Sequence, residues 1–190
     1  MGAYNMNLCE SELIEIVRAF RSSNTNIVKL WNTVEKAFIE AVNNKSIVHI
    51  DKNISFIYEG NILFIKLPSG RRLSYIRPRI DYNNAFNKSV ITYEGVDSTT
   101  KKNTRLTTYG GKLVENIVQA IARDVLGEAM MNLRNKGFNI VMHVHDEIVL
   151  EVENGVSSVE KVVEIMCKEN RYLKGLNLRA DGFESNYYKK

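Results

Sequence analysis

The chain of 190 residues contains no apolar run that approaches the roughly 20 residues a membrane-spanning helix requires. Its first residues, Met1 to Asn5, lack the basic stretch followed by an apolar stretch that marks a secretory signal peptide. The two cysteines, Cys9 and Cys167, show no metal-binding spacing. These absences argue against membrane insertion and secretion, and they favour a cytoplasmic location in which the thiols stay reduced.

The net charge is +4 and the isoelectric point is near 9.0, so the chain carries a modest excess of basic residues. Such an excess mildly favours a polyanionic partner. The distribution of the basic residues is more informative than their number. They gather in two clusters: Arg71, Arg72, Arg77 and Arg79 in the first, and Lys101, Lys102 and Arg105 in the second.

Apolar periodicity predicts one α+β domain, or part of one, without repeats or linkers. Helical spacing is found over residues 10–22, 26–43, 111–135 and 158–169, with Trp31 and Phe38 expected in the core. Alternating patterns predict strands over 54–58, 62–67, 71–75, 89–94 and 175–183. Pro78 is expected to stop the third of these strands, and residues 81–84 and 95–108 are expected to form loops.

The helix predicted over 111–135 has two distinct faces. Its buried stripe consists of apolar residues: Leu113, Ile117, Ile121, Val125, Met130 and Leu133. A second face carries Lys112, Asn116, Gln119 and Arg123 at steps of four, three and four, which aligns them along one side. These side chains, named here the polar row, offer donors suited to phosphates and to the groove edges of a duplex. The alternative is an ordinary polar face exposed to water.

Residues 139–153 predict two strands joined by a very tight turn. Ile140, Met142 and Val144 are expected on one face of the first strand, and Ile148, Leu150 and Val152 on one face of the second. The corner between them consists of His145, Asp146 and Glu147. This composition is unusual, because tight hairpin turns need positive φ and therefore prefer glycine or asparagine.

Two adjacent carboxylates at a rigid corner indicate a cation site. Mg²⁺ takes oxygen ligands, usually one or two carboxylates together with substrate phosphates. The alternative is a surface hairpin with a solvated acidic tip. A short turn, Lys136-Gly137-Phe138, connects the helix predicted over 111–135 to this hairpin. We therefore expect the polar row and the carboxylate corner to be neighbours in space.

Several segments together resemble the family A (polymerase I-like) DNA polymerases. The corner His145-Asp146-Glu147 between two strands resembles the third conserved motif of that family. The segment from Thr108 to Ala120 is similar to the helix before that motif in the phage-encoded branch. Leu67-Pro68-Ser69-Gly70-Arg71-Arg72 is similar to a glycine-arginine segment upstream of it, and Tyr188-Lys189 suits the family's C-terminus. The resemblance runs from near residue 1 to residue 190, with the motifs in the expected order.

The resemblance implies a role for each candidate residue. Asp146 would be one of two aspartates that hold a catalytic pair of Mg²⁺ ions, and Glu147 would help to order the site. His145 would approach the primer end, and Gln119 would face the minor groove near the primer terminus. The residues expected to bind primer–template DNA are Gln119, Asn116, Lys112, Arg123, Arg71 and Arg72.

The resemblance also implies what the chain lacks. The family's first motif, an aspartate-bearing strand, is absent, and so is the fingers helix that binds the incoming dNTP. Residues 1–45 are therefore expected to be a helical remnant of the fingers. Residues 46–190 are expected to be the C-terminal part of the palm, with an antiparallel sheet, the motif hairpin and long packed helices. A full-length phage or prophage parent would add dNTPs to a primer 3′-hydroxyl, whereas the isolated chain would bind Mg²⁺ weakly and would not polymerise.

Two other functions are compatible with parts of the pattern. A non-catalytic nucleic-acid-binding or assembly module would use the polar row and the arginines, and the acidic corner would be merely structural. A His-Asp metal phosphohydrolase is the third hypothesis. It is disfavoured because such enzymes place their ligands on helices with further histidines, whereas His49 is distant and the His145-Asp146 pair lies between strands.

Overall fold

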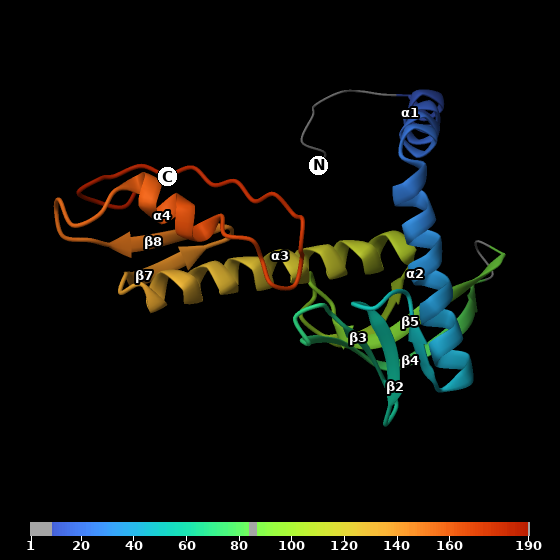
Figure 1. Ribbon diagram of the computed structural model, residues 1–190. Helices are drawn as coiled ribbons and strands as arrows, with labels where there is room; N and C mark the ends of the chain where they lie inside the picture. Colours follow the sequence, from blue (N-terminus) through green and yellow to red (C-terminus); the bar gives the residue numbers. More distant parts are fainter. Residues whose placement is uncertain (1–8, 84–86, 190) are drawn as a thin grey trace. The chain divides into compact units, whose positions relative to one another are not determined.

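The computed structural model describes residues 9–83 and 87–189 (Figure 1). The chain forms two compact units, one comprising Met1–Lys66 and Arg72–Ile117 and the other Leu67–Arg71 and Val118–Lys190. The predicted division at residue 45 concerns polymerase subdomains and stays a prediction, since the compact units begin and end at other residues. The sequence features noted at residues 1–5 and at Asn84 lie outside the described residues.

Within the described residues, four helices and eight strands make a mixed α and β structure, which confirms the predicted α+β class. Their order is α1 (Glu10–Ser23), α2 (Thr25–Asn44), β1 (Ile47–His49), β2 (Ser55–Glu59), β3 (Ile62–Lys66), β4 (Arg72–Asn83), β5 (Lys88–Val96), β6 (Asn103–Thr108), α3 (Gly110–Asn135), β7 (Asn139–Val144), β8 (Glu147–Glu151) and α4 (Val159–Met166). Strands β1 to β6 form one antiparallel sheet in sequential order, and β7 and β8 form a separate hairpin. None of the helices in the described part of the chain combines the length and apolarity needed to cross a membrane.

The core of the first unit lies between α2 and the sheet. Four residues of α2 at helical spacing are buried: Val34, Ala37, Phe38 and Ala41. The Phe38 ring meets the rings of Phe56 and Tyr75 edge-on, at centroid distances of 6.2 and 5.4 Å. The predicted core position of Phe38 is confirmed. Trp31 is only partly buried and stacks on Phe20 at a centroid distance of 6.2 Å.

A tight turn joins β2 and β3, which confirm the strands predicted over 54–58 and 62–67. Glu59 pairs with Ile62, so Gly60 and Asn61 form a two-residue loop, with φ values of +54° and +66°. Glycine and asparagine adopt this conformation at low cost, which explains why the chain reverses here. The reversal places β3 between β2 and β4.

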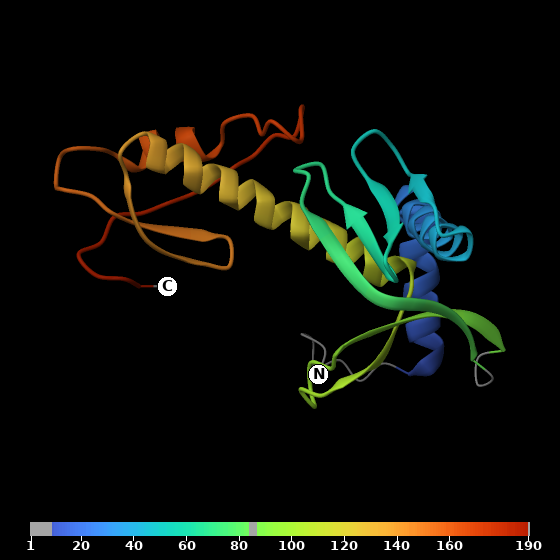
Figure 2. The same cartoon turned by 90° about the horizontal axis from the view of Figure 1, so that it is seen from below.

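The prediction that strand β4 stops at Pro78 is wrong. It continues to Asn83, and Figures 1 and 2 show it as a long, curved strand. Its pairing with β5 shifts register between Ile76 and Arg79, and Arg77 adopts a φ of +44° in this bulge. A bulge tolerates proline because the local ladder is already interrupted, so the missing N–H costs little. The predicted loop after Pro78 is therefore also wrong for the residues up to Asn83.

The loop predicted over 95–108 is wrong as well. Strand β5 continues to Val96, and β6 fills the second half of this segment, so only the turn around Asp97 is irregular. The Asp97 carboxylate accepts hydrogen bonds from the N–H groups of Thr100 and Thr99, at 2.6 and 3.0 Å, and these bonds lower the pKa of Asp97. The polar composition concealed β6, although β-branched threonines suit a strand of which half the residues are exposed. The short strand β1 was not predicted.

In the second unit, the predicted hairpin and the last helix are confirmed. Helix α4 begins after Ser158, whose hydroxyl accepts the N–H of Lys161 at 3.4 Å. No strand follows α4 in the described part of the chain, so the strand predicted over 175–183 is wrong. Side chains fix the start of this final segment instead. Asn170 is buried and donates to Glu128 of α3, and Arg171 pairs with the same carboxylate at 3.4 Å.

Candidate functional site

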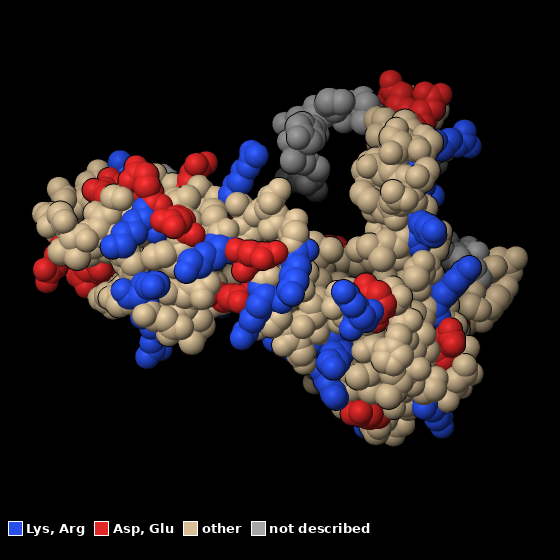
Figure 3. All heavy atoms as spheres, in the orientation of Figure 1, with Lys and Arg blue, Asp and Glu red and all other residues tan. Residues whose placement is uncertain are grey.

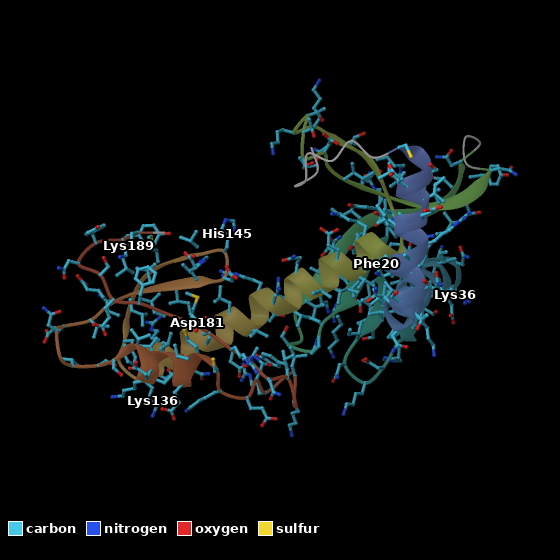
Figure 4. All side chains as sticks on the ribbon, turned by 90° about the horizontal axis from the view of Figure 1, so that it is seen from above. Phe20, Lys36, Lys136, His145, Asp181 and Lys189 are labelled. Carbon is cyan, nitrogen blue, oxygen red and sulfur yellow. The ribbon has the colours of Figure 1, made fainter. Side chains whose placement is uncertain are left out.

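The carboxylate corner lies at the tip of the β7–β8 hairpin. Val144 pairs with Glu147, so His145 and Asp146 alone form the turn, and His145 has a φ of +53°. His145, Asp146 and Glu147 are all exposed, and Figure 4 shows His145 at the hairpin tip with its side chain directed outward. The structure thus gives the predicted outward corner, except that Glu147 already belongs to β8.

Neither carboxylate at the corner is neutralised by a neighbour that the structure describes. Asp146 and Glu147 form no ion pair and accept no side-chain hydrogen bond within residues 9–83 and 87–189. In the same part of the chain, no group of three or more His, Cys, Asp or Glu residues is placed to hold a metal. Mg²⁺ requires near-octahedral oxygen ligation, in which one or two carboxylates are joined by waters and substrate phosphates. The corner can therefore supply part of the ligand set of a Mg²⁺ ion but not all of it.

A β-bulge changes the faces of the hairpin. The register shifts between Ile140 and Met142, which leaves Val141 as the extra residue. Met142 is 37% exposed and Val141 58% exposed, whereas Ile140 and Val144 are half-buried. In β8 the three successive residues 148–150 are all half-buried. The predicted simple alternation of faces is therefore wrong, because the bulge interrupts the period of two.

A contact with α3 fixes β7. Nη2 of Arg123 lies 3.1 Å from Nε2 of His143, and Nη1 lies 3.4 Å from Nδ1. Arginine can only donate, so a ring nitrogen of His143 is the acceptor, and the tautomer decides which of the two it is. The contact places β7 beside α3 and brings Arg123 of the polar row to the hairpin, while the predicted nearness of the whole row to the carboxylate corner stays a prediction. It also occupies the guanidinium of Arg123, which the sequence assigned to DNA.

The first two members of the polar row lie in the first unit. Lys112 pairs with Glu115 at 3.0 Å on the exposed surface of α3. Asn116 is half-buried, and its amide donates to the hydroxyl of Tyr75 at 3.1 Å. Burial raises the pKa of Tyr75, so this hydroxyl is neutral at physiological pH. The amide of Asn116 therefore satisfies a buried phenol, and contact with DNA by Asn116 stays a prediction.

Gln119 is the member of the polar row with the freest side chain. It lies on the part of α3 that belongs to the second unit, and its side chain is exposed. Within the described residues its amide forms no hydrogen bond. The adjacent Val118 is 55% exposed, so this turn of α3 is open to a ligand. An exposed amide of this kind presents both a donor and an acceptor to a groove edge.

The side chains of the two arginines after Gly70 are both held by the protein. Nε and Nη2 of Arg71 donate to the Asp124 carboxylate and to the carbonyl oxygen of Ala120, each at 2.7 Å. Arg72 pairs with Glu59 at 3.2 Å and lies over the ring of Phe64, 5.4 Å from its centroid. The arginine side chains remain 46% and 44% exposed, so their charge is still accessible to an anion.

Asp124 is a structural residue that sequence reasoning missed. Its side chain is 12% exposed, and it accepts hydrogen bonds from Arg71 and from the hydroxyl of Ser69, the latter at 2.6 Å. These bonds dock the segment Leu67–Arg71 onto α3, and this segment belongs to the second unit. The available signal was an acidic residue three positions after Ile121, which places it beside the apolar stripe of α3.

Replacing Asp124 by alanine is expected to lower the free energy of unfolding by about 2 kcal/mol, because hydrogen bonds to charged groups are lost and the Ser69 hydroxyl loses its acceptor. The half-exposed Arg71 guanidinium can turn to water, which limits the cost. Urea unfolding followed by far-ultraviolet circular dichroism measures the effect. Glu153→Ala removes an exposed carboxylate without a partner in the described residues and serves as the control. Equal midpoints for the two variants would contradict the docking role.

Comparison with known proteins gives one informative similarity. No family model matches the chain, and no solved structure matches it. The chain is 51% identical, over all 190 of its residues, to a protein of Bacillus phage SP02 named DNA polymerase. The similarity covers 100% of this chain and 29% of that relative, so the chain spans less than a third of the relative's length.

Proposed function

We propose that this chain is the C-terminal palm portion, with part of the fingers, of a family A DNA polymerase encoded by a phage or prophage. The similarity of all 190 residues to part of a protein named DNA polymerase supports the proposal. The observation that carries it is the exposed carboxylate of Asp146, which has no partner among the described residues and lies in a two-residue turn between antiparallel strands.

In this proposal each residue of the corner has a role in nucleotidyl transfer. Asp146 is the ligand this chain supplies to the Mg²⁺ pair, and Glu147 adds negative charge beside it. When bound, the two ions stabilise the attacking and leaving oxygens of an in-line displacement. His145 extends from the hairpin tip toward the primer end. The remaining ligands come from the aspartate motif that the chain lacks and from the dNTP phosphates.

The partners in this proposal are primer–template DNA and, in the complete enzyme, a dNTP. Gln119 supplies an amide that is unbonded among the described residues to the minor groove, where acceptors on the base edges are common to all pairs. The half-exposed Arg71 and Arg72 contribute positive charge near the phosphates. Lys112, Asn116 and Arg123 keep their proposed roles as DNA contacts, although each has a protein partner in the free chain.

A chimera tests the proposed function. The region of the Bacillus phage SP02 DNA polymerase that aligns with this chain is replaced by these 190 residues, and extension of a labelled primer is measured with and without a template. We expect template-dependent extension by the chimera and none by the isolated chain, because a single carboxylate corner holds Mg²⁺ weakly. A folded chimera that binds primer–template DNA but does not extend it would contradict the proposal. Extension by the isolated chain would show that no further motif is needed.

A further inference from the structure

Helix α1 carries an apolar face that nothing covers in the described part of the chain. Five large apolar side chains of α1 are 46–52% exposed: Leu13, Ile14, Ile16, Val17 and Phe20. Two more on the first turns of α2, Ile27 and Leu30, are 42% and 40% exposed. The buried residues of α2 begin only at Val34, where the helix reaches the sheet. Soluble proteins rarely expose a contiguous apolar surface of this kind unless a partner covers it.

The apolar face contains a groove of about 310 Å³. Leu13, Ile14 and Val17 line the groove, together with Arg18 and Arg21 on the same helix. In the view of Figure 3, the column formed by α1 and the start of α2 is largely uncharged, with charged side chains along its edge and end. The groove thus combines an apolar floor with a positively charged border. A complementary partner has apolar side chains flanked by carboxylates.

The helix has little support of its own. A capping box closes the first turn of α1. In it, the backbone N–H of Cys9 donates to the side-chain carboxylate of Glu12 at 2.7 Å. Near its other end, the ring of Phe20 stacks on the ring of Trp31 of α2. An isolated helix of 14 residues is marginally stable in water, so most of its stability has to come from packing.

We infer that the apolar face of α1 docks onto the part of the polymerase polypeptide that lies outside these 190 residues. This inference rests on the proposed function. The relative that includes this region is far longer, since the chain spans 29% of its length, so the greater part of a related polypeptide is available to cover α1. The contact surface on that part is an apolar segment with acidic residues facing Arg18 and Arg21. The competing occupant is a second copy of this chain. Its own α1 offers both apolar side chains and a carboxylate, Glu15, that could face Arg18 and Arg21.

Co-purification tests the inference. The tagged 190-residue chain is co-expressed with the portion of the SP02 DNA polymerase outside the aligned region, and the complex is sized by light scattering. We expect a one-to-one complex with the unchanged chain. Val17→Asp places a charge in the groove and is expected to weaken the complex about 30-fold or more, as the loss of a central apolar contact does. Val156→Asp, at a site 65% exposed in the second unit, is the matched control and is expected to leave the complex unchanged.

A second variant separates the loss of apolar contact from disruption of the helix by aspartate. The double variant Leu13→Ala and Val17→Ala removes apolar surface while raising helix propensity, so it is expected to weaken the complex without unfolding α1. Absence of a complex with the unchanged chain, or a complex that none of these changes weakens, overturns the inference. A homodimer that Val17→Asp dissociates also overturns it, in favour of a second copy. A complex that forms through α1 but does not extend a primer leaves the docking intact and counts against the proposed function.

Discussion

Replacing Asp146 by asparagine in the chimeric polymerase is expected to reduce primer extension by about 10³-fold or more while DNA binding is retained. Asparagine keeps the shape of the side chain and one oxygen but removes the negative charge that a hard cation requires. Metal ions contribute several kcal/mol of transition-state stabilisation, and about 4 kcal/mol corresponds to this loss of rate. The hairpin itself should tolerate the change, because Asp146 is exposed and makes no side-chain hydrogen bond within the described residues.

The matched control is Asp181→Asn, which makes the same chemical change at another exposed aspartate (Figure 4). We expect this variant to retain the extension rate of the chimera. Steady-state extension rates and the Kd for primer–template DNA are measured for both variants, so that loss of chemistry is separated from loss of binding. If the Asp146 variant keeps its activity, the acidic corner is structural. The alternative of a non-catalytic nucleic-acid-binding module would then be the better description of this region.

Local patterns were sufficient to predict the elements that carry the candidate site. The 26 residues of α3 show a helical period over many turns, and the hairpin follows after a short turn. The prediction failed where a non-local feature overrides a local signal. Pro78 lies in a bulge whose position depends on pairing with β5, and the extra residue Val141 depends on pairing with β8. Neither register can be derived from the spacing of one strand alone.

The partners of the polar side chains were even less accessible from the sequence. Asn116 donates to Tyr75, which lies 41 positions earlier, and Arg71 pairs with Asp124, which lies 53 positions later. Helical spacing shows that side chains share a face of α3 but not what meets that face. The spacing therefore predicts four equivalent side chains in the polar row. The structure distinguishes Gln119, whose amide is unbonded among the described residues, from three neighbours that already have partners.

Replacing Gly110 by alanine is expected to destabilise the first unit by about 3 kcal/mol. Gly110 is the first residue of α3 and lies against the backbone of α2 at Trp31. A Cβ at this position would lie 2.2 Å from the carbonyl oxygen of Trp31 and 2.8 Å from its carbonyl carbon. These are backbone atoms, so α2 itself would have to shift, and overpacking of this kind typically costs about 1–3 kcal/mol. The shift would also disturb the hydrogen bond that the Gly110 N–H donates to the Glu35 carboxylate at 2.7 Å.

Gly127 provides the matched control on the same helix. A Cβ there would meet no atom within 4 Å, so Gly127→Ala is expected to stabilise the helix by up to about 1 kcal/mol through helix propensity. Trp31 is the only tryptophan of the chain and lies in the first unit, so its fluorescence during urea unfolding reports on the contact that Gly110 makes. We expect the Gly110 variant to shift this transition to lower urea with an unchanged slope, and the Gly127 variant to leave it unchanged or move it slightly upward. Coincident fluorescence transitions for the Gly110 variant and the unchanged chain would show that α3 and α2 are not in close contact at this position.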